Sequence, residues 1–267
     1  MAGPTTAERG ERQQESSGPP LVRRLRRLRR PSVRTIVILA AGLVLLAAGA
    51  LWLLYGSQWT RVERVSVSGT RVLTTAQVRE AAEVPLGEPL ISVDTDAIAA
   101  RLRHELPRID TVGVVRSWPR GIELKVVERT PVMVEEKGGK FVEVDDEGVR
   151  FATVSQAPKG VPALQLSLSR SGSAAASLRR FGEGRLVREA VTVAGRIPAA
   201  VARRTRVLKV RTYDDISLEL SGGRTVAWGS GENGAEKARA LTALMKAAPG
   251  ARHFDVSVPT APASSGS

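Results

Sequence analysis

The sequence predicts an α+β protein that one helix holds at a membrane, with most of its residues folded outside the bilayer. Residues 35–55 contain no charged side chain and follow directly on a run of arginines. After residue 60, short Val-rich stretches with alternating polarity are interleaved with segments whose apolar residues recur every three or four positions. These two periods are typical of strands and of amphipathic helices, and their mixture predicts an α+β fold.

The apolar stretch Thr35–Tyr55 is long enough to span a bilayer, because about 20 helical residues cross the hydrocarbon core. Aromatic residues gather at its far end, as is typical of a membrane interface, and arginines precede it and favour a cytoplasmic N-terminus. These topology-determining residues are Arg23, Arg24, Arg26, Arg27, Arg29, Arg30 and Arg34. We therefore predict a single-pass type II protein of the cell membrane, with its C-terminus outside the cytoplasm.

Two kinds of export signal are alternatives to this anchor. A cleaved signal peptide also has a basic start and an apolar core, and Ala48-Gly49-Ala50 resembles a cleavage site. However, apolar residues continue through Leu51–Tyr55 beyond that site. An Arg-Arg export signal is a poor match to Arg29-Arg30-Pro31-Ser32. If either signal operated, the mature protein would be secreted and soluble.

The composition argues against nucleic-acid binding and catalysis. The net charge is +13, but the dense basic cluster adjoins the membrane segment, where anionic lipid and topology account for it. The chain has no cysteine, which excludes a disulfide framework and a thiolate zinc site. Its two histidines, His104 and His253, are far apart in the sequence, so a His-ligated zinc site or a catalytic triad is hard to assemble from them. We therefore expect no nucleic acid, no metal, no small-molecule substrate and no enzymatic activity.

The glycine-rich segment 229–234 matches the dinucleotide-binding pattern G-x-G-x-x-G. The strand before it, Arg224–Trp228, lacks the continuous apolar run of a buried parallel strand. The predicted topology also places this loop outside the cell. We interpret it as a turn that enters a helix, and we expect no cofactor.

The elements follow in order from the N-terminus. Residues 1–34 form a basic cytoplasmic tail, largely disordered, because the first twenty are rich in Glu, Gln, Ser, Gly and Pro. Residues 60–130 predict the order β-α-α-β-β, with two helices on one face of a three-stranded sheet. Their strands are expected at residues 62–68, 109–118 and 122–126, and their helices begin after the capping residues Thr74 and Asp94.

Residues 131–258 predict a second, mixed α/β domain. Strands are expected at 131–135, 140–144, 148–153, 204–211, 216–220, 224–228 and 253–258. Helices are expected at 185–196 and 235–247, the segment 169–177 is expected to be a loop, and 259–267 a flexible tail.

Several motifs, taken in order, resemble the FtsQ/DivIB family of bacterial cell-division proteins from the anchor onward. The most specific run is the family pattern P-x-I/V…V-x-R-x-W-P…I-x-V-x-E-R-x-P. It is carried by Pro107, Ile109, Val115, Arg116, Trp118, Pro119, Ile122, Glu128, Arg129 and Pro131. Further matches are Val65-x-Val67-x-Gly69, Asp146-x-Gly148, Val161-Pro162-x-Leu164, the run Val226-x-Trp228-Gly229…Lys237…Leu241…Leu244, and Asp255-Val256-Ser257. The departures are Trp228, where the family more often has Leu, and the Ser/Ala-rich segment 169–177.

The resemblance implies a POTRA domain at 60–130 and the family's β domain at 131–258. It also implies a non-enzymatic scaffold, enriched at the division septum, that recruits FtsB/FtsL-like coiled-coil proteins and other divisome components. In the family the partner adds a strand beside the last β-strand, a mode in which main-chain hydrogen bonds supply the affinity. Here that strand consists of His253, Phe254, Asp255, Val256, Ser257 and Val258.

Three alternatives remain at this stage. The strand could be an ordinary terminal edge that Pro259 protects from aggregation. A chaperone or translocation factor could also use a POTRA domain, although such proteins usually carry several copies or a following outer-membrane barrel. A secreted enzyme would need a catalytic constellation that the sequence does not offer.

Overall fold

The computed structural model describes residues 32–167 and 171–266, in two units that divide between Ala50 and Leu51. Helix α1 (Val33–Leu51) lies in the first unit up to Ala50 and runs on into a π-helical turn, η1 (Trp52–Gly56), in the second. Among the described residues, Val33–Gly56 is the one helix long and apolar enough to cross a membrane, with a mean hydropathy of 2.6 and no buried residue. The predicted span therefore forms a continuous helix.

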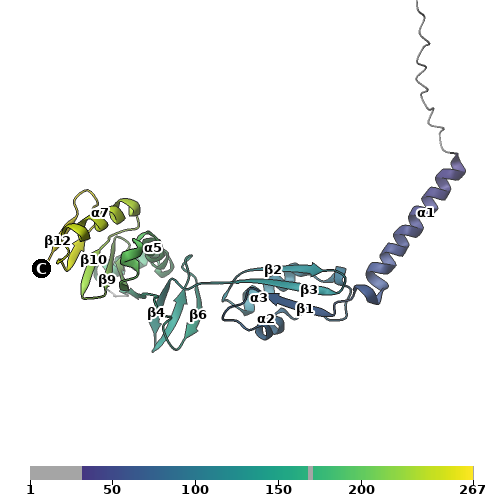
Figure 1. The fold of residues 1–267 in the computed structure, drawn as a ribbon, viewed down its shortest axis with the longest axis horizontal. Coiled ribbons are helices and arrows are strands. Elements are labelled where there is room, and N and C mark those ends of the chain that lie inside the picture. The colour runs from purple at the N-terminus through teal and green to yellow at the C-terminus, as the bar shows by residue number, and fades with distance from the viewer. Residues whose placement is uncertain (1–31, 168–170, 267) are drawn as a thin grey trace, which may run out of the picture. The chain divides into compact units, whose positions relative to one another are not determined.

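The three-stranded sheet matches the predicted β-α-α-β-β order. Its elements are β1 (Arg64–Ser68), α2 (Thr75–Ala82), α3 (Thr95–Glu105), β2 (Ile109–Ser117) and β3 (Gly121–Glu128). Strand β3 lies in the centre, parallel to β1 and antiparallel to β2 (Figure 1). The short 3-10 turns η2 (Gln58–Thr60) and η3 (Leu90–Ser92) precede β1 and α3. The predicted β-α-α-β-β fold of this part of the chain is thus confirmed.

Capping residues and alternating side chains account for these elements. The Thr74 hydroxyl accepts a hydrogen bond from the Gln77 N–H while the Gln77 side chain accepts one from the Thr74 N–H, a complete capping box. Asp94 caps α3 by accepting from the N–H groups of its first turn. The core between helices and sheet consists mainly of Val62, Val78, Ala82, Leu90, Val93, Ile98, Leu102, Ile109, Ile122, Leu124 and Val126.

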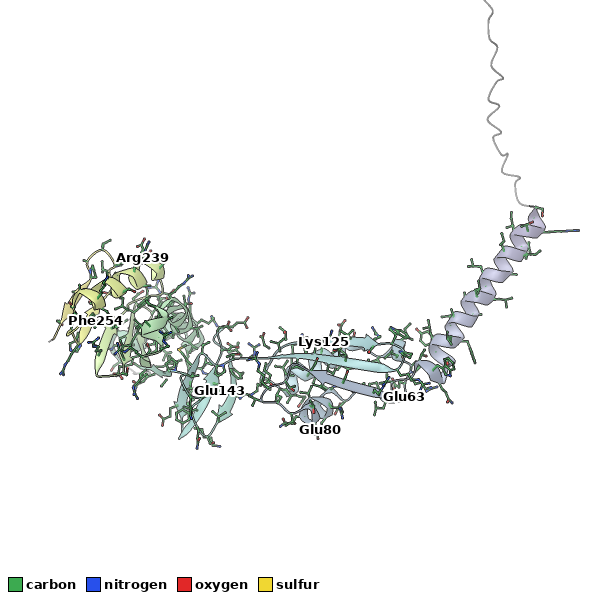
Figure 2. The ribbon with its side chains drawn as sticks, viewed as in Figure 1. Glu63, Glu80, Lys125, Glu143, Arg239 and Phe254 are labelled. Atoms are coloured by element: carbon green, nitrogen blue, oxygen red, sulfur yellow. The ribbon has the colours of Figure 1, made fainter. Side chains whose placement is uncertain are left out.

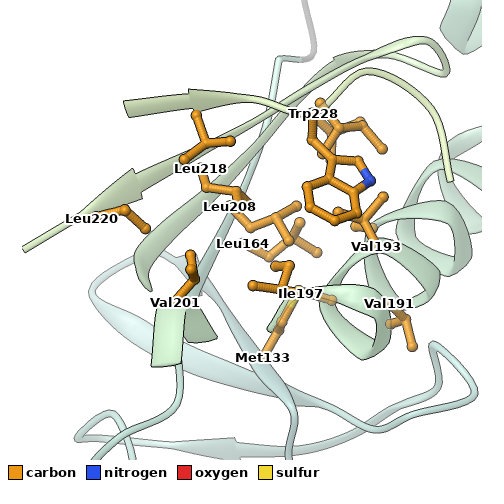
Figure 3. Packing of buried hydrophobic residues seen from close by; sticks show 14 of the residues in the cluster. Met133, Leu164, Val191, Val193, Ile197, Val201, Leu208, Leu218, Leu220 and Trp228 are labelled. Atoms are coloured by element: carbon orange, nitrogen blue, oxygen red, sulfur yellow. The ribbon is translucent and has the colours of Figure 1, made fainter. Parts of the chain in front are cut away.

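The second domain contains a mixed nine-stranded sheet of order β12-β11-β10-β9-β8-β7-β4-β5-β6. Its strands are β4 (Met133–Lys137), β5 (Lys140–Val144), β6 (Arg150–Val154), β7 (Ala163–Leu166), β8 (Thr205–Thr212), β9 (Asp215–Leu220), β10 (Arg224–Ala227), β11 (His253–Asp255) and β12 (Ala263–Ser265). Its helices are α4 (Gly172–Phe181), α5 (Glu183–Arg196), α6 (Ala199–Ala202) and α7 (Gly234–Ala247). Figure 3 shows part of its core, where Trp228 lies against Val193 of α5 beside Leu164 and Leu208 of the sheet.

Two parts of this domain differ from the sequence prediction. The expected loop at 169–177 is wrong in its described part, because α4 begins at Gly172. Ala174 and Ala175 are buried, the Ser177 hydroxyl accepts a hydrogen bond from the Tyr213 N–H, and the Phe181 ring stacks on that of Tyr213. Strand β7, which pairs parallel with both β4 and β8, is absent from the prediction. Tertiary contacts stabilise both elements where the local sequence signal is weak.

Candidate functional site

The candidate protein-binding edge lies at the C-terminal end of the nine-stranded sheet. Strand β11 pairs parallel with β10 on one side, with Phe254 opposite Val226. Phe254, which Figure 2 labels, and Val256 are buried, at 2% and 0% exposure, and they fix this segment to the core. The other four predicted residues, His253, Asp255, Ser257 and Val258, are exposed. The predicted set therefore combines two core residues with four exposed ones.

The strand ends earlier than predicted, at Asp255. The Asp255 carboxylate accepts hydrogen bonds from both the N–H and the hydroxyl of Ser257, at 2.9 and 2.7 Å. Such a local side-chain bond to the second residue along the chain favours a turn over continued pairing. Ser257 and Val258 consequently leave the sheet.

The segment 259–267, predicted to be a flexible tail, contains the outermost strand, β12. It pairs antiparallel with β11, with His253 opposite Ser265, Phe254 opposite Ser264 and Asp255 opposite Ala263. The Arg252 N–H also donates to the Gly266 carbonyl at 2.8 Å. The expected open edge of β11 is therefore covered by the chain's own C-terminal residues, and β12 forms the edge.

The register shows which backbone groups face which neighbour. The Val256 N–H donates to the Ala227 carbonyl of β10 at 2.9 Å. Because alternate residues of a strand direct their N–H and C=O groups to opposite sides, His253 and Asp255 direct theirs toward β12. By the same rule Ser264, opposite Phe254, directs its own N–H and C=O outward. All three residues of β12 are exposed, so this cover buries little apolar surface.

The predicted topology residues are described only in part. Arg34 lies in the first turn of α1 and is exposed. The other six arginines, Arg23 to Arg30, lie outside the described residues.

The motif residues Arg116 and Glu128 stabilise the first domain. The Arg116 guanidinium donates to the carbonyls of Leu90 and Val93 at 3.0 and 2.6 Å. The Glu128 carboxylate accepts from the N–H groups of Arg71, Val72 and Leu73 at 2.7 to 3.1 Å. Burial raises the pKa of Glu128, but these three donors and the charge of Arg108 outweigh it and hold the pKa below its usual value. Glu128 thus fixes the segment between β1 and α2.

The motif residue Arg129 connects the end of β3 to the second domain. It pairs with Asp145, which follows β5, and lies 3.4 Å from both Asp110 and Glu147. The nearby Arg108 pairs with Glu143 of β5 and lies over the Phe151 ring. These charges are structural, because each guanidinium is paired with a carboxylate of opposite sign.

The glycine-rich loop before α7 is a packing feature. Its Gly231 N–H donates to the Glu189 carboxylate, and a Cβ at Gly231 would lie 2.6 Å from that oxygen. Lys237, 2% exposed, reaches back and donates to the Ser230 carbonyl at 2.9 Å. Burial lowers the pKa of Lys237, and the charges of Glu232, Glu189 and Asp214 offset only part of this effect. The Glu189 carboxylate already occupies the Gly231 N–H and packs closely on the loop, which leaves the loop no anion-binding shape.

Sequence reasoning did not identify the two charged residues that hold this loop, the half-buried Glu189 and the buried Lys237. Lys237 lies four residues before the fully buried Leu241, on the same face of α7. A lysine on an otherwise apolar helical face is the signal that would have found it. Within residues 32–167 and 171–266, no group of three or more His, Cys, Asp or Glu could hold a metal ion.

Comparison with known proteins gives consistent matches. Residues 60–129 match the family model "POTRA domain, FtsQ-type". The chain is 75% identical over 267 residues to the cell division protein FtsQ of Streptomyces coelicolor, with all of both chains covered. It is 34% identical over 198 residues to FtsQ of Mycolicibacterium smegmatis, covering 74% of this chain and 55% of that one. The solved extracytoplasmic domain of DivIB from Geobacillus stearothermophilus matches 45% of this chain and 93% of that one, at 17% identity and a TM-score of 0.32.

Proposed function

The chain belongs to the FtsQ family of cell division proteins, and we propose that it is a scaffold that recruits later division proteins to the septum. The family is membrane-anchored and non-enzymatic, which favours this role over the chaperone or translocation factor that a POTRA domain alone would allow. In the proposal, the arginine-rich side of the anchor is cytoplasmic and both folded domains work outside the membrane. The partners are FtsB/FtsL-like coiled-coil proteins.

The proposed binding mode rests on one observation, that a short and exposed strand, β12, occupies the edge of β11. Strand β12 has only three residues, Ala263-Ser264-Ser265, and all of them are exposed. A partner strand with larger side chains would form the same main-chain hydrogen bonds with His253 and Asp255 and bury more apolar surface. We infer that the partner replaces β12 on β11.

Truncation after Val258 tests this replacement. The cover contributes only roughly 1–2 kcal/mol net, because the entropic cost of ordering the tail offsets most of its main-chain hydrogen bonds. Its removal is therefore expected to tighten binding of an FtsB-like partner to the soluble part of the chain by about 5- to 30-fold, measured by calorimetry. Weaker binding after truncation would contradict replacement, and would mean that the partner adds to the outer edge of β12 through Ser264.

A proline at Asp255 tests the main-chain contact itself. Asp255→Pro removes an N–H that faces the partner position, whereas the matched variant Asp255→Ala keeps the N–H and removes only the carboxylate. We expect the first to abolish binding and the second to change it little. Val256 is unsuitable for this test, because its N–H already donates to Ala227 within the sheet. Thermal unfolding of the same samples is the control, and a folded proline variant with normal affinity would move the binding site elsewhere.

A further inference from the structure

Three loops meet where the chain leaves the anchor helix, and each exposes one large apolar side chain. Trp59 follows the helix directly and is 72% exposed. Leu86, in the turn before η3, is 66% exposed, and Trp118, in the turn between β2 and β3, is 51% exposed. These three residues, Trp59, Leu86 and Trp118, are called the apolar triplet below.

Two backbone hydrogen bonds and two from arginine side chains hold the three loops together. The Arg120 guanidinium donates to the Trp59 carbonyl at 3.4 Å, and the Arg120 carbonyl accepts from the Glu63 N–H at 2.9 Å. The Gly87 N–H donates to the Val62 carbonyl at 2.9 Å, and the Arg61 guanidinium donates back to the Gly87 carbonyl at 2.6 Å. The turns that carry Leu86 and Trp118 are therefore fixed beside the segment that carries Trp59.

The same region is fixed to the end of the helix. Thr60 is 7% exposed, and its hydroxyl lies 3.1 Å from the Leu53 carbonyl and 3.2 Å from the Leu54 carbonyl of η1. This turn carries Trp52 and Tyr55, aromatic residues of the kind that mark a membrane interface. The apolar triplet is thus attached, through a short and hydrogen-bonded segment, to the aromatic end of the predicted membrane span.

We propose that the apolar triplet is a lipid-binding surface, through which the POTRA domain rests on the outer face of the membrane. Trp118 and Trp59 would place their rings in the headgroup layer and Leu86 would reach the boundary of the acyl chains, as amphipathic and apolar side chains do at this depth. The three side chains are exposed in the folded chain, and in this proposal they lie at the membrane–water interface. The triplet's hydrogen-bonded attachment to η1, the aromatic end of the apolar helix, selects lipid as the occupant.

The charges around the triplet nearly cancel, so the contact is apolar in character. The cations on these loops are Arg61, Arg64 and Arg120, and the anions are Glu63 and Glu88. Arg120 is already paired with Glu63 at 2.9 Å. Little net charge is left to attract anionic lipid, and the binding should depend weakly on lipid charge and on salt.

Labelling at single cysteines tests the proposal, because the chain has no cysteine of its own. The variants are Trp118→Cys and, as the matched control, Val127→Cys, whose native residue is 53% exposed on β3. Val127 lies six residues along the strand from the turn, roughly 20 Å away, beyond the headgroup layer, which is only about 5–8 Å deep. Each full-length variant carries an environment-sensitive fluorophore and is reconstituted into vesicles of zwitterionic phospholipid.

Lipids brominated in the upper acyl chain should quench the label at position 118 several-fold more strongly than the label at 127, with a blue shift at 118 alone. Leu86→Cys, in a different loop, should behave like position 118, which protects the test against a local disturbance of one turn. Equal weak quenching at 86, 118 and 127 would overturn the proposal and leave the triplet free for a protein partner. Quenching that arises only with anionic vesicles would mean that charge attraction, and not apolar contact, brings the triplet to the lipid, and would overturn the proposal.

Discussion

Replacement of Glu128 by glutamine is the sharpest test of how the family motif stabilises the first domain. Glu128 ends β3, is 8% exposed, and accepts hydrogen bonds from three consecutive backbone N–H groups at Arg71, Val72 and Leu73. Glu128→Gln keeps the size of the side chain but removes its charge. It also substitutes an NH₂ donor for one of the two accepting oxygens.

The expected loss follows from these bonds. A hydrogen bond to a charged group contributes about 1.5–3 kcal/mol and a neutral one about 0.5–1.5 kcal/mol, so each bond that loses its charge weakens by about 1 kcal/mol. One oxygen, Oε1, accepts from all three donors, and the second lies 3.1 Å from the Val72 N–H. In the variant, the NH₂ group takes the place of this second oxygen and faces the Val72 N–H, so that two hydrogen-bond donors meet. We expect a total loss of about 2–3 kcal/mol in the free energy of unfolding near pH 7.

The loss should depend on pH in one direction. The folded-state pKa of Glu128 lies below its usual value of 4.5, so the folded protein binds this proton less readily than the unfolded chain. The stability from the ionised carboxylate is therefore fully present above pH 4.5 and disappears as the pH falls through the folded-state pKa. The difference between wild type and Glu128→Gln should be constant between about pH 5 and 7 and shrink below about pH 4.

Urea unfolding of residues 57–129 measures this difference, with Trp59 and Trp118 as its fluorescent probes. Glu123→Gln is the matched control, because Glu123 lies on the same strand, is more exposed and pairs only with Lys125 at 3.5 Å. Its effect should stay within about 0.5 kcal/mol. A Glu128→Gln loss no larger than that of the control, or a loss that persists unchanged at pH 3, would refute the argued role of the carboxylate.

Two further predictions concern the core and the topology. Leu102→Ala, at a fully buried position of α3, should lower the free energy of unfolding by about 2–5 kcal/mol. The control Leu86→Ala, at a residue that is 66% exposed, should lower it by less than about 0.5 kcal/mol. Equal losses for the two variants in urea unfolding would mean that the helix packs differently. A reporter active only outside the cytoplasm should work when fused after Ser267, and replacing the seven arginines before the anchor by Gln should reduce its activity. A mature protein that begins near Leu51 would instead indicate a cleaved signal.

The first domain could be predicted almost completely because its signals are local. Thr74 and Gln77 form the predicted capping box, and Ile122, Leu124 and Val126 alternate along β3 with their side chains buried. These patterns depend on the period of one element and not on contacts with distant residues. Each predicted boundary therefore lies within a few residues of the observed one.

Helix α4 shows why parts of the second domain could not be predicted. Its buried face consists of Ala174, Ala175 and Ser177, small residues that give little apolar contrast between the two sides of the helix. The Ser and Gly content of 169–177 favours a loop by local propensity. The stacking of Phe181 on Tyr213, from a segment more than thirty residues away, stabilises the helix instead. Such a contact has no signature in the local sequence.

The C-terminal strand presents the same limit at the candidate site, and with a consequence for binding. Ala263-Ser264-Ser265 has no β-branched or aromatic residue, and its composition favours a flexible tail. It becomes a strand because β10 pairs with only one side of β11. The N–H and C=O groups of His253 and Asp255 on the other side still require hydrogen-bond partners, and β12 supplies them. The unpaired groups that order this weak strand are the same groups that a stronger strand from another protein would use. A tail with such low strand propensity and so little buried surface can satisfy the edge in the free protein and still yield to a partner.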